Sequence, residues 1–304
     1  MRKGTGSSLA LLIAAAIWGF AFVAQRVGMK YIGPFTFTGI RFALGAISLI
    51  PLMIFYNNKD EKVKIKNIKG NNNLLGGVII GIILFLAASF QQVGLIGTSA
   101  GKAAFITGLY IVFVPILGLF LRHHIKANTW IGAVIAVVGL YFLCVTNRFS
   151  ISYSDMLELA SAFLFAIHIL LIDYFSQKIN VLKLAFSQFI TCSILSMIMA
   201  VFIEHITFSG ILQALIPILY GGICSVGIAY TLQILGQKNA EPTHAAIICS
   251  METVFATIGG IFILNEQLGV KGSIGCLLML TGMILSQLKS SKQEDENIEI
   301  KSAC

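Results

Sequence analysis

Long apolar segments recur along the whole chain, and short polar segments separate them. Each apolar segment has about 20 residues, the length that a helix needs to cross a bilayer. Because most connections are short, neighbouring segments are expected to run antiparallel. The pattern predicts an all-α integral membrane protein with ten transmembrane helices, at Leu9–Gln25, Phe35–Phe55, Leu74–Ile96, Ala103–Leu121, Trp130–Val145, Met156–Ile172, Leu184–Ile203, Ile211–Leu235, Thr243–Leu264 and Gly272–Leu288.

The pattern of the fourth predicted span returns in the ninth. Residues 98–118 read TSAGKAAFITGLYIVFVPILG, and residues 240–260, which lie 142 positions later, read AEPTHAAIICSMETVFATIGG. At this offset Tyr110 aligns with Glu252. A chain that repeats its own helix pattern is best interpreted as two related halves.

A second echo, at an offset of 147, supports this interpretation. It aligns Trp18 with Phe165 and Arg41 with Gln188. With five spans in each half, the second half enters the membrane in the opposite orientation, as in the inverted repeats of many secondary transporters. The expected parts are a first five-helix repeat at residues 8–146, a second at 155–288, and a disordered cytoplasmic tail at 289–304.

Composition narrows the class of protein. Hydrophobic residues make up 57% of the chain and charged residues only 11%, whereas soluble domains are about 25% charged. The net charge of +8 does not indicate a nucleic-acid partner, because no soluble basic face is present to carry it. With the N-terminus inside, 15 Lys and Arg fall on cytoplasmic segments and 5 on outer loops. This bias predicts a plasma-membrane protein with both termini in the cytoplasm.

Neither the six cysteines nor the N-terminal segment indicates a catalytic or binding site. The cysteines are scattered, without a CxxC motif or His at ligand spacing, so no metal site or disulfide is expected. No cofactor is expected, since the chain contains no GxxxxGK[ST] motif for a nucleotide. The apolar run near the start is too long for a cleaved signal peptide, and we interpret it as the first span.

Several segments of the chain together resemble a known family. Residues 16–28 read AIWGFAFVAQRVG, and residues 39–47 read GIRFALGAI. These two segments resemble the opening of EamA-type members of the drug/metabolite transporter superfamily. Residues 98–118 resemble the fourth helix of its first repeat, and residues 250–285 the matching end of its second. The resemblance covers residues 8–288. It implies a ten-helix carrier, often an exporter of amino acids or other small metabolites.

Glu252 is the strongest candidate for a functional side chain. We interpret it as the only acidic residue that lies well inside an apolar run. A charge at the bilayer centre costs about 2.5–3.5 kcal/mol on insertion scales, so it normally faces a cavity or a partner. Glu252 is expected either to bind a cationic group or to carry a coupling proton, and the alternative is a neutral carboxyl that bonds two helices together.

Further polar and aromatic residues fall on the spans expected to line the seam between the halves. An aromatic cavity with few polar groups suits a small amphipathic solute. For each of these residues taken alone, the alternative to solute contact is a role in packing between helices. With Glu252, the predicted cavity residues are Trp18, Phe22, Gln91, Thr107, Tyr110, His168, Tyr230 and Gln233. His168 is also a second group that could titrate near neutral pH.

Two further polar residues are expected to be structural. Arg41 lies a few residues inside the second span, and its repeat mate is Gln188. Both are predicted to hold helices together. The fifth and tenth spans contain few polar residues, so we expect them to be scaffold or the contacts of a homodimer.

The sequence therefore favours a secondary transporter of amino acids or related solutes that works by alternating access, with export as the expected direction and a proton as the candidate coupling ion. An exporter of lipophilic cations is the alternative within this class. A membrane-embedded enzyme is disfavoured because Asp155, Asp173 and Glu204 appear isolated near helix ends. A channel or a scaffold is disfavoured by inverted halves that enclose a charge.

Overall fold

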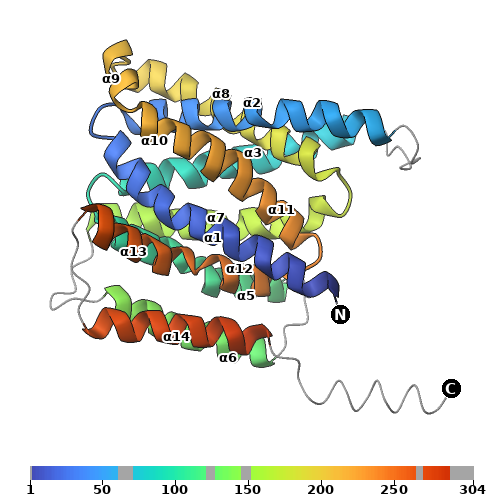
Figure 1. The fold of residues 1–304 in the computed structure, drawn as a ribbon, viewed down its shortest axis with the longest axis vertical. Coiled ribbons are helices and arrows are strands. Elements are labelled where there is room, and N and C mark those ends of the chain that lie inside the picture. The colour runs from blue at the N-terminus through green and yellow to red at the C-terminus, as the bar shows by residue number, and fades with distance from the viewer. Residues whose placement is uncertain (1, 61–70, 121–126, 145–151, 265–269, 288–304) are drawn as a thin grey trace.

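The structure is a computed structural model that describes residues 2–60, 71–120, 127–144, 152–264 and 270–287 (Figure 1). The described part of the first half contains six helices: α1 (Arg2–Gly28), α2 (Pro34–Asp60), α3 (Asn71–Gly94), α4 (Ala100–Gly108), α5 (Tyr110–Phe120) and α6 (Ala127–Cys144). The described part of the second half contains α7 (Tyr153–Ser176), α8 (Val181–Ile203), α9 (Phe208–Gln213), α10 (Leu215–Leu219), the π-helix η1 (Tyr220–Tyr230), α11 (Thr231–Gln237), α12 (Pro242–Cys249), α13 (Glu252–Leu264) and α14 (Val270–Gln287).

Eight helical runs within the described residues are long and apolar enough to cross a membrane. Two shorter apolar stretches, Ala127–Gly139 in α6 and Ser273–Gly282 in α14, stand at the places of the fifth and tenth predicted spans. The prediction of an all-helical, multi-pass membrane protein is confirmed. The number of ten spans stays a prediction, and the predicted tail at 289–304 lies outside the described residues.

Three predicted spans are not single helices, and this corrects the sequence interpretation. The fourth span is divided into α4 and α5 at Leu109, and the ninth into α12 and α13 at Ser250 and Met251. The eighth, predicted at Ile211–Leu235, begins in α9 and continues through α10, η1 and α11. The Ser250 hydroxyl donates to the carbonyl oxygen of Ile247 at 2.8 Å, and such local bonds compete with the regular helix ladder. Apolar periodicity does not reveal interruptions of this kind.

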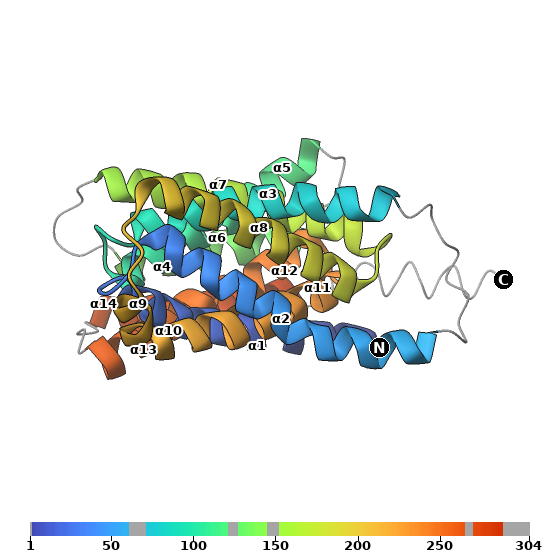
Figure 2. The same cartoon turned by 90° about the horizontal axis from the view of Figure 1, so that it is seen from above.

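The helices lie side by side in one bundle. The α2 and α8 helices form one edge, and α6 and α14 form the opposite edge (Figure 1). Figure 2 shows that α1 and α7, the first helices of the two halves, run in opposite directions. The start of α1 and the end of α14 lie at the same end of the bundle (Figure 1).

The edge formed by α6 and α14 is packed through glycines. A Cβ on Gly139 would lie 2.7 Å from the carbonyl oxygen of Gly275, and a Cβ on Gly282 would lie 2.6 Å from that of Gly132. No side chain fits there, so the two backbones approach closely, as small residues allow in membrane helices. Gly139 and Gly282 are 143 positions apart, and so are Gly132 and Gly275, so the second contact repeats the first with the two helices exchanged.

Candidate functional site

A cavity of about 40 Å³ lies at the centre of the bundle. Since one water molecule needs about 10–15 Å³ on this measure, the cavity has room for a few waters and not for an amino acid. Side chains from both halves of the chain line it. They are Trp18, Phe22, Gln25, Arg41, Gln91, Thr107, Tyr110, Phe165, Ile169, Ser225, Tyr230, Gln233, Cys249 and Glu252.

The structure places eight of the nine predicted cavity residues around this cavity. The exception is His168, which is buried and lies 3.0 Å from Gln188 through its Nε2 and the amide Oε1. Arg41, for which we predict a structural role, also lines the cavity. The structure thus gives the positions of these side chains, while their roles stay predictions.

The lining is built from repeat pairs. Ten of the fourteen lining residues form five pairs at the two offsets found in the sequence. At an offset of 147 the pairs are Trp18 with Phe165 and Phe22 with Ile169; at 142 they are Gln91 with Gln233, Thr107 with Cys249, and Tyr110 with Glu252. A cavity lined by equivalent positions from both halves lies where the halves meet.

A hydrogen bond between repeat mates crosses this cavity. The Tyr110 hydroxyl donates to Oε1 of Glu252 at 3.0 Å, and both side chains are buried. Each residue begins the second segment of an interrupted helix, Tyr110 in α5 and Glu252 in α13. The two interruptions therefore bring an acid and a phenol together at the centre of the molecule.

Aromatic rings form one wall of the cavity. The rings of Trp18 and Tyr230 meet edge to face, with their centroids 4.8 Å apart. The indole N–H of Trp18 donates to the carbonyl oxygen of Ser225 at 3.2 Å, which fixes the ring against η1. The ring of His168 stands edge-on to Tyr230, 6.0 Å between centroids, so His168 supports this wall from behind.

Three lining side chains have polar atoms that no other group satisfies within the part of the protein that the structure describes. They are Oε1 of Gln25, Nε of Arg41 and Oε1 of Gln233, all buried. The guanidinium of Arg41 lies 5.2 Å from the ring centroid of Phe42, and it forms no ion pair among the described residues. An unsatisfied buried polar atom costs about 1–3 kcal/mol, so these atoms need a partner such as water or a solute.

The sequence interpretation missed a second buried carboxyl, and the statement that Glu252 is the only acid inside an apolar run is wrong. Glu158, in α7, is 0% exposed and accepts a hydrogen bond from the Thr107 hydroxyl at 2.9 Å. The predicted sixth span began at Met156, so Glu158 appeared to be a helix-end residue. The helix begins earlier, at Tyr153, and the Ser152 capping box that starts it was a readable signal.

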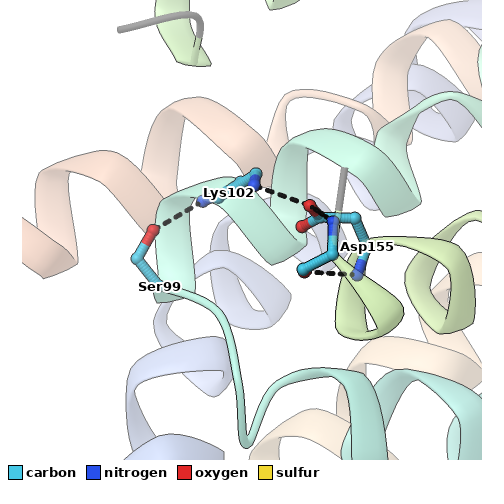
Figure 3. A network of polar contacts seen from close by, with 4 residues as sticks. Ser99, Lys102 and Asp155 are labelled. Carbon is cyan, nitrogen blue, oxygen red and sulfur yellow. Dashed lines mark hydrogen bonds and ion pairs between the residues drawn. The ribbon is translucent and has the colours of Figure 1, made fainter. Parts of the chain in front are cut away.

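Two acids that appeared isolated have partners. Asp155 pairs with Lys102 at 2.8 Å, next to the Ser99 cap of α4 (Figure 3). Glu204 accepts hydrogen bonds from the backbone N–H groups of Phe35 and Thr36, at 2.7 and 2.8 Å. Asp155 thus connects α7 to α4, and Glu204 caps α2. Neither contact could be predicted from the sequence, because the partners are far apart along the chain.

Metal ligation is not indicated in the part of the chain that the structure describes. No group of three His, Cys, Asp or Glu side chains there is close enough to hold a metal ion. The cysteines described, Cys192, Cys224 and Cys249, are free thiols. The groups that the cavity offers are therefore hydrogen-bonding side chains, one guanidinium, one carboxyl and aromatic faces.

A multi-pass helical bundle with a central, partly polar cavity is typical of membrane transporters. Residues 5–145 and 152–288 each match the EamA-like transporter family. The chain therefore belongs to this family, and the expected resemblance is confirmed. The double match agrees with the two halves seen in the sequence.

Similar proteins carry the same general description. An uncharacterized transporter of Archaeoglobus fulgidus is 31% identical over 284 residues, which cover 93% of this chain and 86% of the relative. The uncharacterized transporter YoaV of Bacillus subtilis is 21% identical over 295 residues, or 94% and 98%. A solved crystal structure has the same fold, with a TM-score of 0.75 at 16% identity over 93% of this chain and 96% of that one. These names indicate a transporter rather than an enzyme.

Proposed function

We propose that the protein is a secondary transporter that exports small metabolites, amino acids or related solutes, across the plasma membrane by alternating access. The observation that carries the proposal is the set of side chains that line the cavity. The guanidinium of Arg41, which forms no ion pair among the described residues, and the carboxyl of Glu252 line one cavity together with aromatic rings. A solute with one carboxylate, one amine and a small side chain satisfies both groups.

The proposed architecture is ten spans arranged as two inverted repeats, with residues 8–146 and 155–288 as the halves. Three observations support it: the opposite directions of α1 and α7 (Figure 2), the five repeat pairs in the cavity, and the reciprocal contact of α6 with α14. Rocking of one half against the other then opens the central cavity to each side in turn. The cavity is too small for the proposed solute, which corresponds to an occluded state.

The proposed membrane orientation has both termini in the cytoplasm. The bias of Lys and Arg supports it, and so does the position of the start of α1 and the end of α14 at one end of the bundle (Figure 1). We also propose that a proton is the coupling ion. A homodimer through α6 and α14 stays a proposal, since these helices form an outer edge and expose apolar side chains such as Tyr141 and Leu277.

The test is a flux assay in proteoliposomes with a panel of amino acids, with and without a proton gradient. Glu252→Gln and Arg41→Gln are each expected to lower flux at subsaturating solute by about tenfold or more, because a hydrogen bond to a charged group contributes about 1.5–3 kcal/mol. Thr281→Val, on the exposed face of α14, is the control and should transport like the wild type.

A quaternary ammonium dye in the same vesicles tests the alternative substrate class. The Arg41 guanidinium in the cavity repels a permanent cation, so the dye is not expected to move. Transport of the dye without transport of any amino acid would contradict the proposal and favour the exporter of lipophilic cations. Unchanged amino-acid flux in both Glu252→Gln and Arg41→Gln would show that these side chains are structural.

A further inference from the structure

A second polar site lies one hydrogen bond behind the cavity wall. Glu158 occupies the space between α7, α3 and α4, where its Oε2 accepts the Thr107 hydroxyl at 2.9 Å. Thr107 in turn lines the cavity and lies 3.4 Å from the amide nitrogen of Gln91. The other carboxyl oxygen of Glu158, Oε1, is buried and has no hydrogen-bond partner among the described residues. The side chain thus has one free oxygen in a closed site.

The groups that face Glu158 do not neutralise it. From α4 comes Lys102, but its ammonium is engaged by Asp155 at 2.8 Å. From α3 come Gln91 and Gly94, which do not titrate. The remaining acids close enough to act on Glu158 electrostatically are Asp155 on α7 and Glu252 on α13. Because no cation among the described residues is left to pair with it, the buried Glu158 carboxyl is a group that can take up a proton.

Packing alone does not require an acid at this position. An equivalent site lies at the two repeat offsets, with Leu11 in the place of Glu158 and Cys249 in the place of Thr107. A Cβ on Gly94 would lie 2.9 Å from Cγ of Glu158, and a Cβ on its mate Gly236 would lie 2.6 Å from Cγ of Leu11. The same glycine-covered space is therefore filled by leucine at one site and by a carboxyl at the other.

Few residues separate Glu158 from solvent at one end of the bundle. Asp155 lies one turn before Glu158 on α7, and its Oδ1 is buried without a hydrogen-bond partner among the described residues. Its partner Lys102 is partly exposed, with a side-chain exposure of 39%. This ion pair lies near the start of α4 (Figure 3), at the end of the bundle opposite the start of α1 (Figure 2). The order from solvent inward is thus Lys102, Asp155, Glu158, Thr107 and the cavity.

We propose that Glu158 is a proton-binding site of the transporter, loaded and unloaded through the Lys102–Asp155 end of the bundle. One proton passes from solvent to the Glu158 carboxylate and leaves again when the site reopens. Its coupling to solute movement rests on the proposed function, whereas the binding of the proton itself does not. One carboxyl and one hydroxyl provide too few oxygens for Ca²⁺ or Mg²⁺, so the ligand is a proton.

Infrared difference spectroscopy between acidic and alkaline pH tests proton binding without any solute. The reconstituted wild-type protein is expected to show the carbonyl stretch of a buried protonated carboxyl that disappears at alkaline pH. Glu158→Gln and Glu158→Leu should both lose this band, and Glu158→Leu reproduces the packing of Leu11. Leu11→Met, in the matching space of the other half, is the control and should keep the band. Glu158→Asp restores a carboxyl and should restore a shifted band.

Two spectroscopic results would overturn the proposal. One is a carboxyl band that persists in Glu158→Gln and Glu158→Leu and disappears only in Glu252→Gln, which assigns the titrating group to Glu252. The other is a Glu158 band that does not change between acidic and alkaline pH, which makes Glu158 a permanently neutral structural group.

Transport separates coupling from the proposed function. In vesicles that exchange amino acids, flux driven by a proton gradient should be lost in Glu158→Gln, while gradient-free exchange should persist. Loss of both fluxes would show that Glu158 acts on solute binding instead of coupling. If the wild type moves no amino acid, the proposed substrate class fails, but the infrared result still decides whether Glu158 binds a proton.

Discussion

Two pockets at matching positions of the molecule have different contents. In one, Glu158 of α7 lies against Thr107 of α4 and is covered by Gly94 of α3; in the other, Leu11 of α1 lies in one hydrophobic cluster with Cys249 of α12 and is covered by Gly236 of α11. The backbone frame is thus repeated, while the polar chemistry is present on one side only. Matching backbone positions therefore do not require matching chemistry, and the pocket that contains the acid is the one for which we propose proton binding.

The strongest test of the shared frame is the contact between α6 and α14. Gly139→Val and Gly282→Val each place a side chain against backbone atoms at less than 3 Å, which cannot be relieved by a rotamer change. Each is expected to lower the free energy of unfolding by about 3 kcal/mol and to lower the midpoint of thermal unfolding in detergent. Since the contact is reciprocal, the two losses should be similar. A loss in one variant only would contradict the symmetry of this edge.

A smaller effect on stability is expected from substitutions at the N-terminal caps of α2 and α8, which are built differently. The N-terminus of α2 is capped from a distance by Glu204, whose Oε2 also accepts the Thr36 hydroxyl at 2.6 Å. The N-terminus of α8 is capped locally by Asn180, which bonds the N–H groups of Leu182 and Lys183.

Glu204→Ala should therefore lower the free energy of unfolding by about 2 kcal/mol, since the carboxylate makes several charged hydrogen bonds. Asn180→Ala should lower it by about 1 kcal/mol, as for an ordinary cap. Chemical denaturation of the two variants, with Glu204→Gln as an intermediate, measures the difference. Equal losses would mean that the long-range contact adds nothing beyond capping.

The smallest expected effect concerns the residues beside the two pockets. Thr107→Val removes the hydroxyl that bonds Glu158 and should lower the free energy of unfolding by about 1 kcal/mol. It should also shift the infrared band of the Glu158 carboxyl. Cys249→Val is the matched change beside Leu11, and Cys249 is a buried free thiol. A shift of the same band in Cys249→Val would show that the pockets are not independent.

The sequence predicted most of the frame because bilayer-length apolar runs and repeat offsets are properties of the chain alone. Trp18, Tyr110 and Glu252 could be assigned to one cavity from their spans and their repeat positions. Glu158 could not, because its environment depends on where α7 begins and on Thr107, which is 51 positions away. The same limit hid the partners of Asp155 and Glu204, which lie on other helices.

Arg41 shows a different limit. Its position near the start of the second span suggested a role between helices, and its side chain does lie near Phe42. The sequence does not show that the guanidinium reaches the cavity, since this depends on how α2 packs against η1 and α8. The packing of three helices decides whether a buried cation is structural or available to a solute.

The small volume of the central cavity has a consequence for measured affinity. If the closed arrangement predominates at rest, a solute binds only the minor fraction of molecules that are open. When about one molecule in a hundred is open, the apparent dissociation constant is about a hundredfold weaker than that of the open site. A substitution far from the cavity that favours the open arrangement would then tighten apparent binding without contacting the solute.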